Sequence, residues 1–223
     1  MASVSNKQIP QCFRAYRPKW LQWLGRAVLS ILGWKVSGKI SEEFANQKLV
    51  VIVAPHTSNW DGIVGVATLA GLDAKISFIG KHTVFKYFGL GAFLRYMGGI
   101  PVDRSKPGGI IKDALDQIKK IDCSLIAMAP EGTRSKVKDW KTGFLRIAKE
   151  LNTKIILASI DFSKKEILLG KAFAPSGDNF KDILELINYY SSFTPRHPDK
   201  FSLRASSIIS STSSSTINNG GLP

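Results

Sequence analysis

Apolar runs alternate with stretches of helical periodicity along most of the chain. A short apolar run between turn residues predicts a buried strand, and apolar residues at helical spacing predict a helix. The predicted strands are residues 49–54, 75–79, 100–102, 124–129 and 154–160, followed by an edge strand at 166–169. The predicted helices are residues 63–72, 84–97, 108–121, 143–151 and 182–190. This alternation predicts an α/β fold, in which helices flank a layered sheet that is mixed or largely parallel.

The first 41 residues differ from this pattern, because they contain seven Lys or Arg residues and no acidic residue. Residues 20–34 read as an apolar helix with three tryptophans. A helix of this length spans about 22 Å, which is less than the roughly 30 Å hydrocarbon core of a bilayer. We therefore predict an N-terminal interfacial helix on an anionic membrane, with contacts from Trp20, Trp23, Arg26 and Trp34. The alternative is an ordinary amphipathic helix packed on the domain.

The last 22 residues, 202–223, are dominated by serine and contain few large apolar side chains. Such a segment cannot bury enough surface to become ordered, so it is predicted to be a disordered tail. The expected organisation is a basic amphipathic membrane-interfacial segment at 1–41, one folded domain at 42–201 and the tail at 202–223.

The charge of the chain narrows the choice of partners. Its 31 Lys and Arg residues outnumber 17 acidic residues, which gives a net charge of +14. This excess indicates an anionic partner, either a membrane surface or nucleic acid. The two cysteines, Cys12 and Cys123, are predicted to be unpaired thiols. The three histidines include no close pair, so we predict no metal site.

His56 and Asp61 stand where the strand at 49–54 gives way to the next helix. Strand ends of α/β sheets are where such folds place their chemistry. A histidine can act as a base near neutral pH, and an aspartate can orient its ring and stabilise its protonated form. The alternative is a turn histidine beside a helix-capping aspartate, and the spacing by itself leaves both open.

Two further loops place an arginine after a strand. They are residues 98–105, which contain Arg104, and residues 129–135, which contain Arg134. Arginine binds phosphate oxygens well because its planar group donates two hydrogen bonds at once. Gly132 permits close backbone approach, and Thr133 adds a hydroxyl donor. One base with two phosphate ligands describes an enzyme that deprotonates a hydroxyl on a phosphorylated acceptor.

Three motifs in order resemble the glycerolipid acyltransferase family, whose best-known members acylate 1-acylglycerol-3-phosphate to phosphatidic acid. The motifs are His-x4-Asp at 56–61, Gly-Ile-Pro-Val-Asp-Arg at 99–104 and Pro-Glu-Gly-Thr-Arg at 130–134. The resemblance covers roughly residues 30 to 190. It implies the glycerol-3-phosphate acyltransferase-like fold. It also implies that His56 is the general base and Asp61 its orienting partner. The implied acceptor-phosphate ligands are Arg104 and Arg134, with Glu131 and Gly132 lining the acceptor site. Thr133, whose hydroxyl is a donor in the same loop, completes the predicted substrate-binding residues.

The reaction implied by this resemblance needs no bound cofactor and no covalent enzyme intermediate. The acyl donor would be acyl-CoA or acyl-carrier protein, and the acceptor a lysophospholipid. Residues 84–97 are a candidate wall for the acyl chain, with core packing as the alternative. The expected location is the cytoplasmic face of the membrane, as a peripheral or monotopic protein.

Three alternatives stay open at this stage. The acceptor could be a different lysolipid. The basic charge could instead serve nucleic-acid binding, although no recognition motif supports such a partner. The same His, Asp and Arg residues could also belong to a phosphoester hydrolase, although the chain lacks the clustered carboxylates of a two-metal site.

Overall fold

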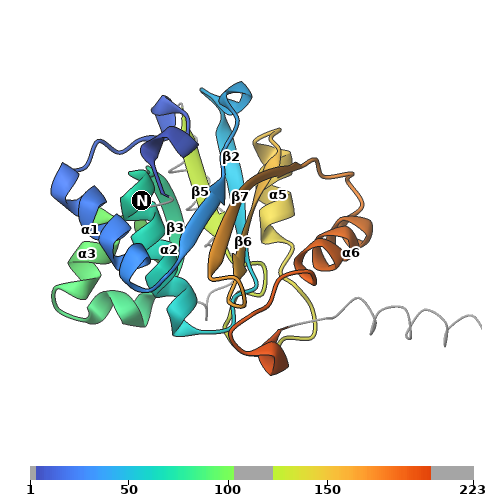
Figure 1. Cartoon of the computed structure of the whole chain (residues 1–223). Coiled ribbons are helices and arrows are strands. Elements are labelled where there is room, and N and C mark those ends of the chain that lie inside the picture. Colours follow the sequence, from blue (N-terminus) through green and yellow to red (C-terminus); the bar gives the residue numbers. More distant parts are fainter. Residues whose placement is uncertain (1–3, 103–122, 202–223) are drawn as a thin grey trace, which may run out of the picture.

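The computed structural model describes residues 4–102 and 123–201 of the chain (Figure 1). The described residues form one seven-stranded sheet, in the order β1-β7-β6-β2-β5-β3-β4. The strands are β1 Lys35–Gly38, β2 Lys48–Ala54, β3 Ile76–Lys81, β4 Gly99–Val102, β5 Ser124–Met128, β6 Ile155–Asp161 and β7 Glu166–Phe173. The described pairings are parallel except that of β6 with β7. The predicted α/β fold with a mixed, largely parallel sheet is confirmed.

Helices cover both faces of the sheet (Figure 1). The α-helices of the described residues are α1 Lys19–Ile31, α2 Asn59–Leu72, α3 Leu90–Tyr96, α5 Gly143–Glu150 and α6 Asn179–Tyr190. Short 3₁₀ helices are η1 Asn6–Gln8, η2 Gln11–Phe13, η3 Glu42–Phe44, η4 His82–Lys86 and η5 Pro198–Lys200. The helix predicted at 108–121 and the tail at 202–223 lie outside the described residues.

Strand β2 explains why the sheet has two hydrophobic layers. Leu49 and Val51 belong to the layer that α1 and α2 cover, whereas Val50 and Ile52 belong to the layer that α5 and α6 cover. Successive side chains of a strand point to opposite faces, so a strand covered on both sides must be apolar at every position. This requirement gives the uninterrupted apolar run that the sequence shows at 49–54.

The outer strand β1 was not predicted, and the prediction of 166–169 as an edge strand was wrong. β1 pairs with β7 in parallel, so β7 lies second from the edge. Within β1 only Val36 is buried. A strand with one buried side chain has no apolar pattern to detect. Residues before position 41 thus contribute to the sheet, and Ile9, Phe13 and Leu29 join the core of the domain.

Helix α1 packs tightly on α2. A Cβ atom at Gly25 would come within 2.6 Å of the Ala67 carbonyl oxygen and 2.7 Å of the Gly71 nitrogen, so only glycine allows this approach. The Nε–H of Arg26 donates to the Gly71 carbonyl at 3.0 Å. Arg26, predicted to contact a membrane, therefore links two helices of the domain.

Arg17 is a second N-terminal cation whose side chain contacts other residues of the domain. The side chain of Arg17 is buried beside Asp73 and donates to the carbonyl oxygen of Ala74 at 2.8 Å. Burial lowers the pKa of Arg17, although the Asp73 carboxylate opposes this effect. Part of the basic excess of residues 1–41 thus anchors the segment before α1 to the domain.

Two local predictions need correction. The helix predicted at 84–97 is divided into η4 and α3 by residues 87–89, and Gly89 has a positive φ of 72°. Cys12 and Cys123 were predicted to be unpaired, but a disulfide joins them. Their separation of 111 positions in the sequence gave no sign that the fold brings them together.

Candidate active site

The candidate site lies at the carboxyl end of β2, where residues 55–58 connect this strand to α2. The peptide bond between Ala54 and Pro55 is cis. β2 has β6 on one side and β5 on the other, so the segments after these two strands flank the connection. The segments that follow β2, β5 and β6 therefore lie together at one edge of the sheet, where their side chains can form a site.

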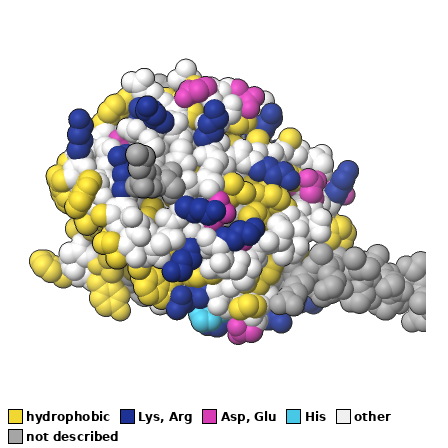
Figure 2. Space-filling model, in the orientation of Figure 1, with side chains coloured by type: hydrophobic (Ala, Val, Ile, Leu, Met, Phe, Trp, Pro, Cys, Tyr) yellow, Lys and Arg dark blue, Asp and Glu magenta, His cyan; other side chains and the backbone are white. Residues whose placement is uncertain are grey.

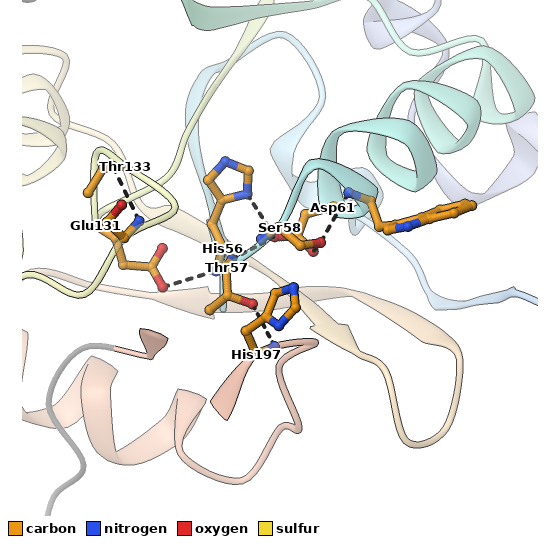
Figure 3. A network of polar contacts seen from close by, with 9 residues as sticks. His56, Thr57, Ser58, Asp61, Glu131, Thr133 and His197 are labelled. Carbon is orange, nitrogen blue, oxygen red and sulfur yellow. Dashed lines mark hydrogen bonds and ion pairs between the residues drawn. The ribbon is translucent and has the colours of Figure 1, made fainter. Parts of the chain in front are cut away.

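His56 and Asp61 are in contact (Figure 3). Nδ1 of His56 lies 3.2 Å from Oδ2 of Asp61, and their side chains are 25% and 1% exposed. The carboxylate is therefore buried, while the imidazole keeps a surface that a substrate can reach. A base held on one side by a carboxylate and open on the other is the arrangement that general base catalysis requires.

The Asp61 carboxylate is fixed by the first turn of α2. Its Oδ2 accepts hydrogen bonds from the N–H groups of Thr57 at 2.6 Å and Ser58 at 2.8 Å. The Ser58 hydroxyl donates to Oδ1 at 3.0 Å and also accepts the N–H of Trp60. Ser58 and Asp61 form a capping box. The N–H groups of Thr57, Ser58 and Trp60, and that of Asp61 through the capping box, are thus already in use, which removes them as donors to a reaction oxyanion. Asp61 therefore both caps the helix and contacts His56, so its capping role does not exclude the pair that the sequence suggested.

Glu131 enters the site from the loop after β5 (Figure 3). Its Oε1 accepts the N–H of His56 at 3.0 Å, and the residue is 2% exposed. Its Oε2 is buried and has no hydrogen-bond partner among residues 4–102 and 123–201. Burial raises the pKa of Glu131 to about 8, although the hydrogen bond from His56 opposes this shift. Glu131 thus holds the backbone of His56 in this structure, whereas the sequence indicated contact with the acceptor.

The remaining predicted residues of this loop surround Glu131. Gly132 has a φ of 67°, a left-handed conformation that favours glycine. The hydroxyl of Thr133 accepts the N–H of Ser135 at 3.3 Å. Arg134 is exposed, and its side chain forms no ion pair or hydrogen bond with any residue that the structure describes. Its guanidinium donors are therefore available to a ligand.

The second arginine loop stands in a different place. Arg104 lies outside the described residues, and the strand before it, β4, forms the edge of the sheet. Strands β5 and β3 separate β4 from β2. The sequence had suggested that both arginine loops emerge beside His56. Only the loop of Arg134 follows a strand next to β2.

A third segment, which sequence reasoning missed, reaches the site from the carboxyl end of the domain. The N–H of His197 donates to the hydroxyl of Thr57 at 3.2 Å (Figure 3). Arg196, the preceding residue, lies over the ring of Trp60. These residues are separated from the loop by up to 140 positions. No local pattern of the sequence could have indicated the contact.

The site thus combines a partly exposed histidine on a buried carboxylate with an exposed arginine on the neighbouring loop. It can remove a proton from a hydroxyl group and bind an anionic group close by. Within the described part of the chain, no group of three or more His, Cys, Asp or Glu side chains could hold a metal ion.

Comparison with known protein families identifies a family whose reaction is consistent with this site. A family model described as Acyltransferase matches residues 35–161, which is more than half of the chain. The chain therefore belongs to the Acyltransferase family, and the sequence-based prediction of an acyltransferase is confirmed. No curated protein matches the sequence.

A solved structure shares the fold. It is the crystal structure of the 1-acyl-sn-glycerophosphate (LPA) acyltransferase, PlsC, from Thermotoga maritima. The similarity has a TM-score of 0.53 and 20% sequence identity, and it covers 75% of each chain. At this identity the likeness concerns the fold.

Proposed function

We propose that the protein transfers a fatty acyl group from acyl-CoA or acyl-carrier protein to the hydroxyl of a lysophospholipid. The proposed acceptor is 1-acyl-sn-glycerol-3-phosphate, and the product is phosphatidic acid. The observation that carries the proposal is the contact between His56 and Asp61 at the end of β2, beside the exposed Arg134. The similar solved structure is named as an LPA acyltransferase, which supports this choice of acceptor.

In the proposed mechanism His56 removes the proton of the acceptor hydroxyl as its oxygen attacks the thioester carbonyl. Asp61 keeps the imidazole in the productive tautomer and stabilises its protonated form. The tetrahedral intermediate then collapses, the carbon–sulfur bond breaks, and His56 returns the proton to the leaving thiolate. The ester and the free thiol are the products, and the enzyme regains its starting state.

An acyl-transfer assay tests the proposal directly. Purified protein is incubated with a panel of lysolipids and acyl thioesters, and the products are followed by mass spectrometry. Formation of phosphatidic acid supports the proposal. Acylation of another lysolipid in the panel, without phosphatidic acid, would contradict the proposed acceptor, and no product with any pair would contradict the reaction.

Replacing Arg134 by alanine is expected to raise the KM for a phosphorylated acceptor about tenfold, because one charge-assisted hydrogen bond to the phosphate is lost. The KM for the acyl donor should stay within about twofold. Arg146 is an exposed arginine on α5, and Arg146→Ala is the matched control. Equal KM values for the acceptor in the natural protein and Arg134→Ala would remove the phosphate-binding role.

We further propose that the protein attaches to the membrane surface through α1 and α3. Large hydrophobic side chains gather on the side of the molecule where these helices lie (Figure 2). The exposed members are Tyr16, Trp20, Trp23, Leu24, Ile31, Tyr87, Phe88, Leu90, Phe93 and Tyr96. Lys19, Lys86 and Arg95 accompany them, which favours an anionic leaflet such as the cytoplasmic one. No helix of the described residues has the length and apolar character needed to cross a bilayer.

This surface differs from the one that the sequence suggested. Trp20 and Trp23 are exposed, but Trp34 is 8% exposed and packs edge-on against Phe162, with 4.9 Å between ring centres. Trp34 was therefore wrongly predicted to contact a membrane, because α1 ends at Ile31 and the chain then turns into β1. The side chains of residues 84–97, considered as a wall for the acyl chain, are largely exposed, whereas Phe85 and Met97 are buried.

Replacing Phe88 or Trp23 by serine is expected to weaken binding to vesicles of phosphatidylglycerol and phosphatidylcholine about tenfold, because a large apolar side chain no longer enters the bilayer. Phe180 on α6 is 70% exposed, close to the 69% of Trp23, but α6 covers the other face of the sheet. Phe180→Ser should therefore bind vesicles like the natural protein. Equal losses in Phe88→Ser and Phe180→Ser, measured by sedimentation, would contradict the proposed surface.

A further inference from the structure

An arginine in cation–π contact with two aromatic rings lies on the opposite side of the β2 connection from Arg134. The guanidinium carbon of Arg196 is 5.3 Å from the ring centre of Trp60 and 5.7 Å from that of Phe162. Trp60 directly precedes Asp61 in the first turn of α2, and Phe162 directly follows β6. Since β2 lies between β6 and β5, Arg196 and the loop of Arg134 flank the end of β2 from its two sides.

Two backbone hydrogen bonds hold the segment that carries Arg196. The N–H of Phe162 donates to the carbonyl oxygen of Thr194 at 2.8 Å. The N–H of His197 donates to the hydroxyl of Thr57 at 3.2 Å (Figure 3). These contacts lie on either side of Arg196 in the sequence and fix it next to Thr57, the neighbour of His56. The cation is thus positioned by the same loop that carries the proposed base.

The contacts of Arg196 leave its hydrogen-bond donors unused. A cation–π contact attracts the charge of a guanidinium group to the ring and pairs none of its N–H groups with an oxygen acceptor, so these donors remain able to bind an anion. Arg196 is exposed, and within residues 4–102 and 123–201 no carboxylate pairs with it. Asp161, which precedes Phe162, accepts hydrogen bonds from the N–H groups of Ser163 and Lys164 instead.

We propose that Arg196 binds a phosphate group of a substrate of the acyl transfer. Two parallel hydrogen bonds from its planar group would match two phosphate oxygens. This inference rests on the proposed function and adds a second phosphate position to it, across His56 from Arg134. A phosphate of the acyl donor and the phosphate of the lysophospholipid share this chemistry, and the experiment distinguishes them.

The test uses Arg196→Gln, which keeps a planar polar group near Trp60 but removes the charge. We expect the KM of one phosphorylated substrate to rise about tenfold, with kcat within about twofold. The donor arm compares acyl-CoA with an acyl-N-acetylcysteamine thioester, which has no phosphate. The acceptor arm compares lysophosphatidate with monoacylglycerol. A rise confined to the phosphorylated member of one arm supports the proposal and identifies the source of the phosphate.

Lys171→Gln is the matched control. Lys171 is also an exposed cation stacked on an aromatic ring, 4.4 Å from the ring centre of Tyr189. It pairs in register with Leu157 in the first half of β6, away from the end of β2. Lys171→Gln should keep both KM values of the natural protein.

The outcomes separate this inference from the proposed function. Unchanged KM values in Arg196→Gln, or equal losses with the phosphate-free substrates, would overturn the phosphate role while acyl transfer itself stands. Absence of transfer by the natural protein would overturn the proposed function. In that case the phosphate role of Arg196 is tested by calorimetric titration, which measures the affinities of the natural protein and Arg196→Gln for free CoA and for glycerol 3-phosphate. Weaker binding of either compound by Arg196→Gln supports the inference, and equal affinities for both overturn it.

Discussion

Replacing His56 by alanine is expected to lower kcat for acyl transfer by roughly three orders of magnitude, the usual contribution of a well-placed general base. The imidazole is partly exposed and contacts the buried Asp61 carboxylate. Without it no side chain at this position can take the proton from the acceptor hydroxyl. The measurement is the initial rate with saturating lysophosphatidate and acyl-CoA.

Two comparisons make this result specific. His82→Ala removes another histidine, at the start of η4, and should keep kcat within about threefold. The free energy of unfolding of His56→Ala should stay within about 1 kcal/mol of the natural value, because the imidazole is partly exposed and Glu131 contacts the backbone of residue 56, which alanine keeps. Vesicle binding should also be unchanged. Full activity of His56→Ala would exclude His56 as the base.

Replacing Glu131 by glutamine is expected to change how stability depends on pH. In the folded protein the pKa of Glu131 is about 8, so its carboxyl group stays protonated up to about this pH, whereas in the unfolded chain it ionises near its ordinary pKa of 4.5. Between these two values the unfolded state binds fewer protons, so the free energy of unfolding of the natural protein falls as pH rises. The decrease relative to Glu131→Gln is at most about 1.4 kcal/mol per pH unit. The amide oxygen of glutamine can still accept the His56 N–H.

Denaturant unfolding at pH 5, 6, 7 and 8 measures this difference. Glu185→Gln, at an exposed position of α6, should track the natural protein within about 0.5 kcal/mol at every pH. Asp61 and Tyr190 lie near enough to Glu131 to influence its charge, and both are present in all three proteins. A constant difference between the natural protein and Glu131→Gln across the pH range would show that Glu131 is ionised in the folded state.

The sequence predicted best those elements that are buried along their whole length, because burial requires an apolar run that can be recognised in the sequence. β2 is buried on both faces, and its observed start differs from the predicted one by a single residue. α2 begins at Asn59, four residues before the predicted start, because the polar turn from Ser58 to Asp61 forms a capping box instead of a loop. β1 could not be predicted, since Val36 alone is buried there.

The site was predictable to the extent that its residues are neighbours in the sequence. His56 and Asp61 are five positions apart, and the turn that joins them decides their contact. The bond between Glu131 and the His56 backbone spans 75 positions, and that between His197 and Thr57 spans 140. Such contacts depend on the strand order β6-β2-β5, which periodicity does not reveal. For the same reason the apolar pattern could not distinguish the buried Trp34 from the exposed Trp23.

The close packing of Gly25 against α2 affects the depth of the candidate site relative to the membrane surface. α1 carries exposed aromatic side chains, and α2 carries Asp61 at its first turn. Gly25 brings α1 into backbone contact with α2, the helix whose first turn holds Asp61, so the position of α1 is tied to that of the candidate site. With α1 at the membrane surface, the imidazole of His56 would stay at a constant depth relative to the lipid headgroups. A lysophospholipid could then present its hydroxyl group while its acyl chain stays in the bilayer.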